Sequence, residues 1–316
     1  MATALTDQGP EPETLSPAEQ TRPAWPVVAW HAIRPRTLPL ALSPVVAGAA
    51  LGWVESGAPR PVITGVALLC TLAIQIGTNL HNDAADTLNH TDDSSRRGPA
   101  RVTQQGWMTP RQVLNAAHFS FALAMVLGMW LVSQGGWPIL LIGLLSVLTG
   151  YAYSSGPWPI SRGPLGELVV ILFFGLVAVG GMVYLHTGTV GPPALLMGLV
   201  VGLPAAAVLL VNNTRDRLGD TRAGRRTLAI LIGPRRSVGV YGLLLATALV
   251  GLATLALMDP ALRGAAPGLI CAPLAWRAWR AFAAADAPAD FNATLARTGG
   301  LQAVMTTTTA LGLIAI

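Results

Sequence analysis

From Gln112 to Ser161 the chain reads QVLNAAHFSFALAMVLGMWLVSQGGWPILLIGLLSVLTGYAYSSGPWPIS, 50 residues without Asp, Glu, Lys or Arg. A helix crosses the ~30 Å hydrocarbon core of a bilayer with about 20 residues, so this run is long enough for two spans. Near its middle lies Gly135-Gly136-Trp137-Pro138, and clustered Gly and Pro are typical of a break between helices. The stretch therefore predicts two membrane helices joined by a short turn.

The composition of the whole chain supports an all-α integral membrane protein. Of the 316 residues, 52% are apolar and only 11% are charged, where soluble domains average about 25% charged. A soluble enzyme and a disordered chain are therefore excluded. The two cysteines lie in apolar segments, so no disulfide framework is expected. The net charge of +5 is the balance of 20 Arg and 15 acids, with no Lys. No basic stripe is interleaved with aromatics, so no nucleic-acid partner is expected.

The other gaps between charges predict seven more spans by length alone, which gives about nine in total. The first 24 residues differ from the rest because they contain four prolines and four acids but no apolar stretch. We therefore expect a flexible polar tail at 1–24, without the pattern of a signal peptide, and a transmembrane domain at 25–316. The additional charge-poor runs are 37–54, 61–82, 168–214 (two spans, broken near Gly188 to Pro193), 237–258, 262–282 and 298–316.

The arginines are distributed unevenly between the two sides of these nine spans. One side receives the N-terminus and the loops near 83–111, 155–163, 215–236 and 283–297. With Arg277 and Arg280 this side holds 18 Arg, whereas the other holds only Arg60 and Arg263. Because positive residues stay in the cytoplasm, we expect a multi-pass protein of the inner (plasma) membrane with a cytoplasmic N-terminus.

Polar side chains end the second predicted span, on the Arg-rich side. The segment GTNLHNDAAD runs from Gly77 to Asp86 without a Gly or Pro break after its first polar residue, so it is expected to stay helical. Asn79, Asn82 and Asp86 are then spaced i, i+3, i+7, and Asp83 follows Asn79 by four. Residues at these spacings share a helix face.

A second polar segment, VNNTRDRLGD, ends the sixth predicted span on the same side. Asn212, Asp216 and Asp220 are spaced i, i+4, i+8 and also share a face. The two segments are 130 residues apart from Asp86 to Asp216, and each closes an even-numbered span. This pattern favours a duplicated four-helix unit with the two polar faces opposite one another.

Facing carboxylates at the edge of a membrane need a cation. An acid at the centre of a membrane helix costs ~2.5–3.5 kcal/mol, and less near the interface. Oxygen ligands suit Mg²⁺, which prefers one or two carboxylates together with waters and substrate phosphates. The expected partners are therefore Mg²⁺ and a diphosphate or phosphate ester held between metal and Arg. The alternative is that each acid is a helix-end residue paired with a neighbouring Arg.

The motifs resemble those of the UbiA superfamily of intramembrane aromatic prenyltransferases. The two Asp-rich motifs carry the likeness to the superfamily, which covers about residues 30–316. Other segments resemble the branch that acts on 1,4-dihydroxy-2-naphthoate in menaquinone synthesis. These are Arg34-Pro35-Arg36-Thr37-Leu38-Pro39-Leu40, Gly98-Pro99-x-Arg101, Asn212-Asn213-x-Arg215-Asp216 followed by Gly224-x-x-Thr227-Leu228, Tyr151-x-Tyr153-Ser154-x-Gly156-Pro157, Gly166-Glu167 and Phe173-Phe174-Gly175.

The resemblance implies a UbiA-like bundle and a Mg²⁺-dependent transfer of a polyprenyl chain from its diphosphate to the naphthoate ring. The ring carboxylate would leave as CO₂, giving a demethylmenaquinone. The implied metal ligands are Asn82, Asp83, Asp86, Asp216 and Asp220. The implied catalytic residues are Asp83, Asp86, Asp216, Asp220, Arg101, Arg215 and Tyr153, and the implied substrate-binding residues are Asn79, Asn212, Asn213, Arg36 and Arg97.

One position departs from the wider superfamily. The first motif there often ends with a further Asp, where this chain has His90, and the naphthoate branch tends to carry its next acid slightly later, as Asp92 does. The roles of His90, Asp92 and Asp93 stay open, as do the prenyl chain length and the oligomeric state.

Other activities remain as alternatives. The aromatic acceptor could be 4-hydroxybenzoate or homogentisate in place of the naphthoate. A cation-coupled secondary transporter also carries intramembrane acids, but places them near the bilayer midplane on broken helices. A CDP-alcohol phosphotransferase is disfavoured because its DGxxAR and GxxxDxxxD motif is not found.

Overall fold

The computed structural model describes residues 22–89, 98 and 100–315. The tail predicted at 1–24 therefore lies outside the described residues except for its last three. Within the described part the regular elements are all helices, as predicted. They are α1 (Trp25–Ile33), η1 (Pro35–Thr37), α2 (Leu38–Ser56), α3 (Pro61–Leu88), α4 (Pro110–Gly135), α5 (Trp137–Ala152), η2 (Ile160–Arg162), α6 (Gly166–Ile171), η3 (Leu172–Val177), α7 (Ala178–Thr187), α8 (Pro192–Arg222), α9 (Leu228–Met258), η4 (Pro260–Cys271), α10 (Ala272–Ala283) and α11 (Pro288–Ala315).

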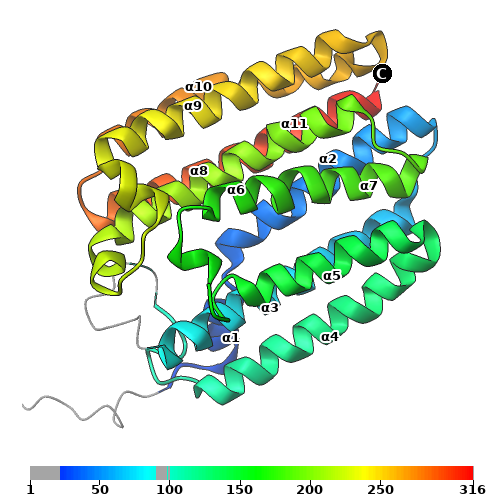
Figure 1. The fold of residues 1–316 in the computed structure, drawn as a ribbon. Helices are drawn as coiled ribbons and strands as arrows, with labels where there is room; N and C mark the ends of the chain where they lie inside the picture. Colours follow the sequence, from blue (N-terminus) through cyan, green and yellow to red (C-terminus); the bar gives the residue numbers. More distant parts are fainter. Residues whose placement is uncertain (1–21, 90–97, 99, 316) are drawn as a thin grey trace, which may run out of the picture.

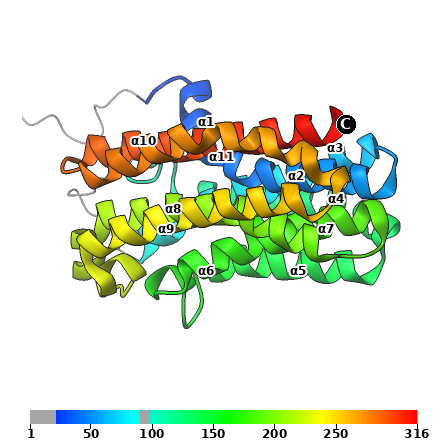
Figure 2. The same ribbon diagram turned by 90° about the horizontal axis from the view of Figure 1, so that it is seen from above.

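The long helices run side by side in one bundle (Figures 1 and 2). Leaving aside the short α1, η1 and η2, and counting α6–η3–α7 and η4–α10 as one span each, the described residues form nine spans, which confirms the predicted number. Six helical segments are long and apolar enough to cross a membrane, and α5 is a shorter apolar helix. Exposed Leu, Val, Phe and Trp side chains along the outside fit contact with lipid.

Glycine and proline set the helix ends. Gly57, Gly136 and Gly188 follow α2, α4 and α7 with φ of +74°, +69° and +78°, a conformation that Gly adopts at little cost. Proline occupies the first turn of the helix that comes next, where its missing N–H is not needed. The breaks predicted near Gly135–Pro138 and Gly188–Pro193 are therefore confirmed.

The polar segments stay helical beyond the apolar spans. α3 continues to Leu88 and α8 continues to Arg222, so both Asp-rich motifs lie on the last turns of their helices. This confirms the expectation that each motif presents its acids on a helical face.

Two predicted spans begin later than the helices that contain them. α11 starts at Pro288, ten residues before the predicted 298. Its first turns contain Asp290 and Arg297, so a span defined by the absence of charge could not include them. α9 starts at Leu228, before the predicted 237, and is kinked at Gly233, where φ is +76°. Pro234 follows the kink, and a proline inside a helix removes one backbone hydrogen bond.

The Arg-rich connections gather at one end of the bundle, as the alternation of nine spans predicts. The α5–α6, α8–α9 and α10–α11 connections and the described part of the α3–α4 connection lie towards the left side of Figure 1. The backbone N–H of Arg226 donates to the carbonyl of Arg162 at 2.7 Å, which joins two of them. Arg60 and Arg263 lie at the start of α3 and within η4, at the other end.

Tight packing brings α8 to the centre of the bundle. At Gly175, in the π-helical turn η3, an added Cβ would overlap the carbonyl oxygen of Gly198 on α8. Close approach through small residues is typical of membrane helices. α8 also packs against α2, α9 and α11, so it is surrounded by other helices of the bundle.

Candidate functional site

The first Asp-rich motif is bound to the connection that follows it. The Asp86 carboxylate accepts a hydrogen bond from Arg101 Nη1 at 2.6 Å, and the same nitrogen donates to the carbonyl of Asn82 at 3.2 Å. Both charged side chains are 9% exposed. Arg101 is thus fixed against the end of α3, as a charge-assisted pair shielded from water.

Asp83 points into that same connection. Its carboxylate accepts hydrogen bonds from the Thr103 hydroxyl and from the backbone N–H of Val102, the latter at 3.2 Å. Thr103 also bonds the Thr87 hydroxyl at 2.6 Å. Asp83 therefore orients the segment that carries Arg101, and the structure does not bring it together with the acids of α8.

The second motif is organised around a buried arginine. The Arg215 Nε and Nη2 atoms contact the two carboxylate oxygens of Asp216 at 2.8 and 2.6 Å. Arg215 also donates to Asn212 Oδ1 at 2.8 Å and to Asn292 Oδ1, on α11, at 2.6 Å. All these partners are oxygen acceptors, and the guanidinium group is held in one orientation by its neighbours.

A third arginine joins the two motifs. Arg225, in the turn after α8, donates from Nη2 to Asp86 Oδ1 at 2.7 Å and from Nη1 to Asp220 Oδ1 at 3.2 Å. The predicted opposition of the two polar faces is realised through this contact.

The asparagines of the motifs bind neighbouring helices. Asn79 Nδ2 donates to Thr37 Oγ1 at 2.9 Å and to the carbonyl of Ile33 at 3.1 Å. Asn213 Nδ2 donates to the buried Glu167 carboxylate at 3.0 Å. These contacts are interhelical, so two of the predicted substrate-binding residues also hold the site in shape.

Asn82 and Tyr153 come from adjacent helices. Asn82 Oδ1 accepts from Ser154 Oγ, just beyond α5, at 2.7 Å, and Tyr153 lines the same cavity as Asn82. Burial, with the nearby carboxylate of Glu167, raises the pKa of Tyr153 above its ordinary value. The phenol is therefore neutral at physiological pH and available as a hydrogen-bond donor.

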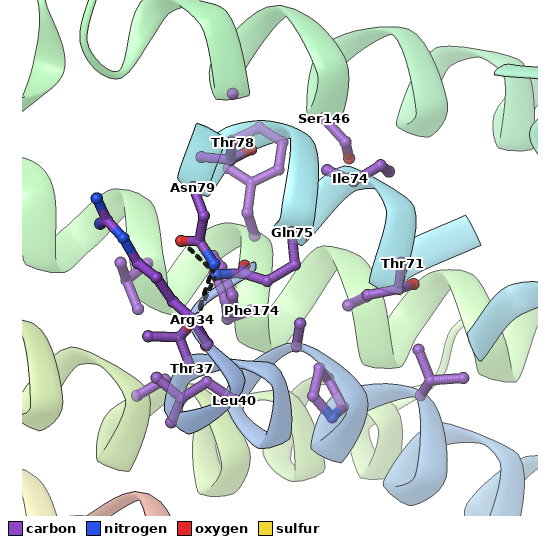
Figure 3. Close-up of a pocket in the computed structure, with 18 of the residues that line it drawn as sticks. Arg34, Thr37, Leu40, Thr71, Ile74, Gln75, Thr78, Asn79, Ser146 and Phe174 are labelled. Atoms are coloured by element: carbon purple, nitrogen blue, oxygen red, sulfur yellow. Dashed lines mark hydrogen bonds between the residues drawn. The ribbon is translucent and has the colours of Figure 1, made fainter. Parts of the chain in front are cut away.

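A cavity of about 730 Å³ begins at the motifs and extends along the bundle. Its polar end is lined by Arg36, Asn79, Asn82, Asn212 and Arg215, among others. In Figure 3 Asn79 and Gln75 point from α3 towards Thr37, beside Arg34 and Leu40. The remaining wall is mostly apolar and ends near the opposite turns of the bundle, at Val45, Ala67, Leu131, Ile139, Met182 and Leu185.

A cavity with one charged, polar end and a long apolar body fits an amphiphile with an anionic head. Ligand sites combine apolar walls with a few placed polar groups in this way. Nothing in the described cavity wall supplies a Ser–His or Cys–His pair for nucleophilic catalysis.

Comparison with known proteins decides the family. Residues 41–298 match the model of the UbiA prenyltransferase family.

The chain belongs to the UbiA prenyltransferase family.

Relatives from this family align over most of the chain. The 1,4-dihydroxy-2-naphthoate octaprenyltransferase of Mycobacterium tuberculosis is 38% identical over 78% of this chain and 82% of that protein. The protein of the same name from Escherichia coli is 34% identical over 71% and 75%. The solved structure of a UbiA homolog from Archaeoglobus fulgidus bound to DMAPP and Mg²⁺ has the same fold, with a TM-score of 0.64, 16% identity, and coverage of 91% and 99%.

Membership of the UbiA family confirms the expected enzyme class, a membrane prenyltransferase, and the UbiA-like bundle. The expected Mg²⁺ ion agrees with the Archaeoglobus homolog. Among the described residues no three His, Cys, Asp or Glu side chains form a metal cage by themselves. The donor set nevertheless fits Mg²⁺, which needs only one or two protein carboxylates beside waters and phosphate oxygens.

Several residues named in the sequence analysis lie outside the part of the chain that the structure describes. Arg97, His90, Asp92 and Asp93 fall within residues 90–97. The substrate-binding role of Arg97 therefore stays a prediction, and the roles of His90, Asp92 and Asp93 stay open.

Two residues of the site, Arg225 and Asn292, were not predicted from the sequence. Arg225 lies outside the helical spacing of the second motif, and the only signal was its place in an Arg-rich turn. Asn292 lies before the predicted start of the last span, so nothing in the pattern of spans placed it beside Arg215.

Proposed function

We propose that this family member transfers a polyprenyl chain from its diphosphate to 1,4-dihydroxy-2-naphthoate. The allylic C–O bond breaks, diphosphate leaves and a carbon–carbon bond forms to the ring. The ring carboxylate departs as CO₂ and the prenyl group replaces it overall, so the ring gains and loses no net proton, and the product is demethylmenaquinone in its reduced form. The observation that carries this proposal is the identity of 31–38% with several 1,4-dihydroxy-2-naphthoate octaprenyltransferases, each over most of the chain.

The polar end of the cavity supports a diphosphate site. Asp86, Asp216, Asp220 and Asn82 would hold Mg²⁺ there. The ion supplies neutralisation of the leaving diphosphate when it is bound. Asp83 stays a predicted ligand, and its contacts support a further task, holding the segment of Arg101.

Arg101 and Arg215 are the residues proposed to bind the diphosphate oxygens. Each is fixed by its contacts with motif residues, so little side-chain entropy is lost when an anion binds. Arg36 and Asn212 line the same polar end, and Arg97, Asn79 and Asn213 complete the proposed substrate-binding set. Tyr153, whose phenol is protonated at physiological pH, would donate a hydrogen bond at this end of the cavity.

The apolar body of the cavity would hold the prenyl chain and keep water from the reacting carbon. Exclusion of water matters because an allylic cation is otherwise hydrolysed. We also propose that the Arg-rich end faces the cytoplasm, following the positive-inside rule.

Membranes containing the protein, incubated with a labelled prenyl diphosphate and each of three acceptors, test the proposal. Product is expected with 1,4-dihydroxy-2-naphthoate, together with release of labelled CO₂ from a carboxyl-labelled acceptor. Activity only with 4-hydroxybenzoate or only with homogentisate would overturn the choice of acceptor. Loss of prenyl transfer after chelation would support an enzyme that needs Mg²⁺ and would argue against a transporter.

A further inference from the structure

Arg225 is built into the site by its own backbone. Its N–H donates to the carbonyl of Asp220 at 2.9 Å, and Gly224 before it has a φ of +72°. Gly tolerates this conformation, which lets the chain turn sharply after α8. The turn therefore aims the Arg225 side chain back over the end of α8 towards α3.

The guanidinium group lies between carboxylates from two helices. Its contacts with Asp86 and Asp220 measure 2.7 and 3.2 Å. The Arg225 side chain is 16% exposed, that of Asp86 9% and that of Asp220 12%. Removing carboxylates from water without a cation is costly. Arg101 also compensates Asp86, and Arg225 is the positively charged partner that Asp86 and Asp220 share.

The same two carboxylates are those that the proposed function assigns to Mg²⁺. A carboxylate oxygen bonded to a guanidinium group cannot offer the same lone pair to a metal ion. Mg²⁺ bound between Asp86 and Asp220 would compete for these oxygens and repel the adjacent guanidinium charge, which favours release of Arg225 from at least one of its contacts. A released, partly buried guanidinium group needs another acceptor, and the diphosphate of the substrate is the anion that enters this end.

We propose that Arg225 is a tethered counter-ion. It holds the two motifs together when the site lacks metal, yields Asp86 and Asp220 to Mg²⁺, and then binds the diphosphate. This inference rests on the proposed function. It makes Mg²⁺ and diphosphate binding mutually favourable, because the anion stabilises the released arginine and coupling between two ligands is reciprocal.

The inference predicts that removing Arg225 strengthens binding of Mg²⁺ alone. Purified Arg225→Gln protein is titrated with Mg²⁺ by calorimetry, without any diphosphate, beside the wild type. The matched control is Arg226→Gln, because Arg226 is exposed in the same turn and its loss removes the same charge. Arg225→Gln is expected to bind Mg²⁺ about fivefold more tightly or better, at the lower end of typical coupling between sites, and Arg226→Gln as the wild type does.

A second measurement uses the unmodified chain, so that it does not depend on folding of the variant. Phenylglyoxal labels accessible guanidinium groups, and mass spectrometry reads each arginine. Arg225 is expected to be slow to react without metal, faster with Mg²⁺ alone, and slow again with Mg²⁺ and inorganic pyrophosphate. Exposed Arg226 serves as the internal control, with no such pattern.

Equal or weaker Mg²⁺ affinity in Arg225→Gln, or labelling of Arg225 that ignores Mg²⁺, would overturn the inference. Prenyl transfer by the wild type would stand in that event, which separates this failure from failure of the proposed function. A wild-type chain that binds neither Mg²⁺ nor pyrophosphate would overturn both.

Discussion

Asp86 on α3 and Asp220 on α8 bind the same guanidinium group, at 2.7 and 3.2 Å. The two acids belong to the two Asp-rich motifs, so this contact is the direct structural link between the motifs. Both side chains are largely buried, and breaking a buried ion pair by removing one partner typically costs ~3–5 kcal/mol. The site is therefore an ordered cluster of acids and arginines, and under the proposed function its contacts rearrange when an ion and an anionic substrate bind.

Removal of either motif acid should stop turnover without preventing insertion. In Asp86→Ala and Asp216→Ala we expect the rate of prenyl transfer to fall by a factor on the order of 10²–10³ or more, as when a group that stabilises transition-state charge is lost. Rates are measured at equal amounts of membrane-inserted protein. Asp259→Ala is the control, because Asp259 is exposed at the start of η4, away from the motifs. Near-normal rates in both motif variants would remove the metal assignment.

The positions of the spans could be predicted because they depend on local chemistry. A charge-free run of 50 residues is long enough for two membrane helices, and Gly135-Gly136-Trp137-Pro138 near its centre marks the turn between them. α4 and α5 are these two helices. The spacing of Asn79, Asn82 and Asp86 likewise required only a continuing helix.

The contacts within the site could not be predicted from the sequence, because they join segments that are far apart along the chain. The contact of Arg215 with Asn292 requires α11 to start at Pro288 and to pack beside α8. The contact of Asp83 with Thr103 depends on how the α3–α4 connection folds back, and no periodicity encodes that. The contacts of Arg225 with both Asp86 and Asp220 likewise cannot be predicted from spacing along one helix.

The Asp83–Thr103 contact leads to a prediction about substrate affinity. Thr103→Val removes one donor to a buried carboxylate, which typically costs ~1–3 kcal/mol. Because Asp83 orients the segment that carries Arg101, KM for the prenyl diphosphate should rise more than kcat falls. Steady-state kinetics and thermal melting of the purified protein measure both effects. Thr254→Val is the control, since the exposed Thr254 hydroxyl bonds only to its own helix. Unchanged KM in Thr103→Val would separate Asp83 from Arg101.

Metal dependence should appear in stability as well as in rate. Mg²⁺ at about 100 times its Kd should stabilise the folded chain by ~2.7 kcal/mol, because a ligand that binds only the folded state adds its binding free energy. Asp220→Asn should lose most of this stabilisation, while Asp290→Asn on α11, an exposed carboxylate outside the motifs, should keep it. Thermal melts with and without EDTA provide the measurement. Equal stabilisation of both variants would place the ion elsewhere.

The apolar body of the cavity predicts a limit on prenyl chain length. Gly143 on α5 lines the cavity, and an added Cβ there meets nothing within 4 Å. It lies ten residues before Tyr153, or ~15 Å along a helix. Leu at this position should occupy cavity volume without straining the backbone, since Leu favours a helix more than Gly does. In Gly143→Leu we expect kcat/KM to fall by about tenfold for long prenyl diphosphates and to stay near the wild-type value for geranyl diphosphate, a difference of ~1.4 kcal/mol.

A substitution outside the cavity controls for effects of the added leucine. Gly65 on α3 also has nothing within 4 Å of an added Cβ, and it does not line the cavity. Gly65→Leu should therefore turn over every chain length as the wild type does. If Gly143→Leu slowed all chain lengths equally, or slowed none, the long chain would have to lie outside this cavity, in a groove open to lipid. Because the expected loss grows with chain length, a series of prenyl diphosphates locates the depth at which the chain first meets Gly143.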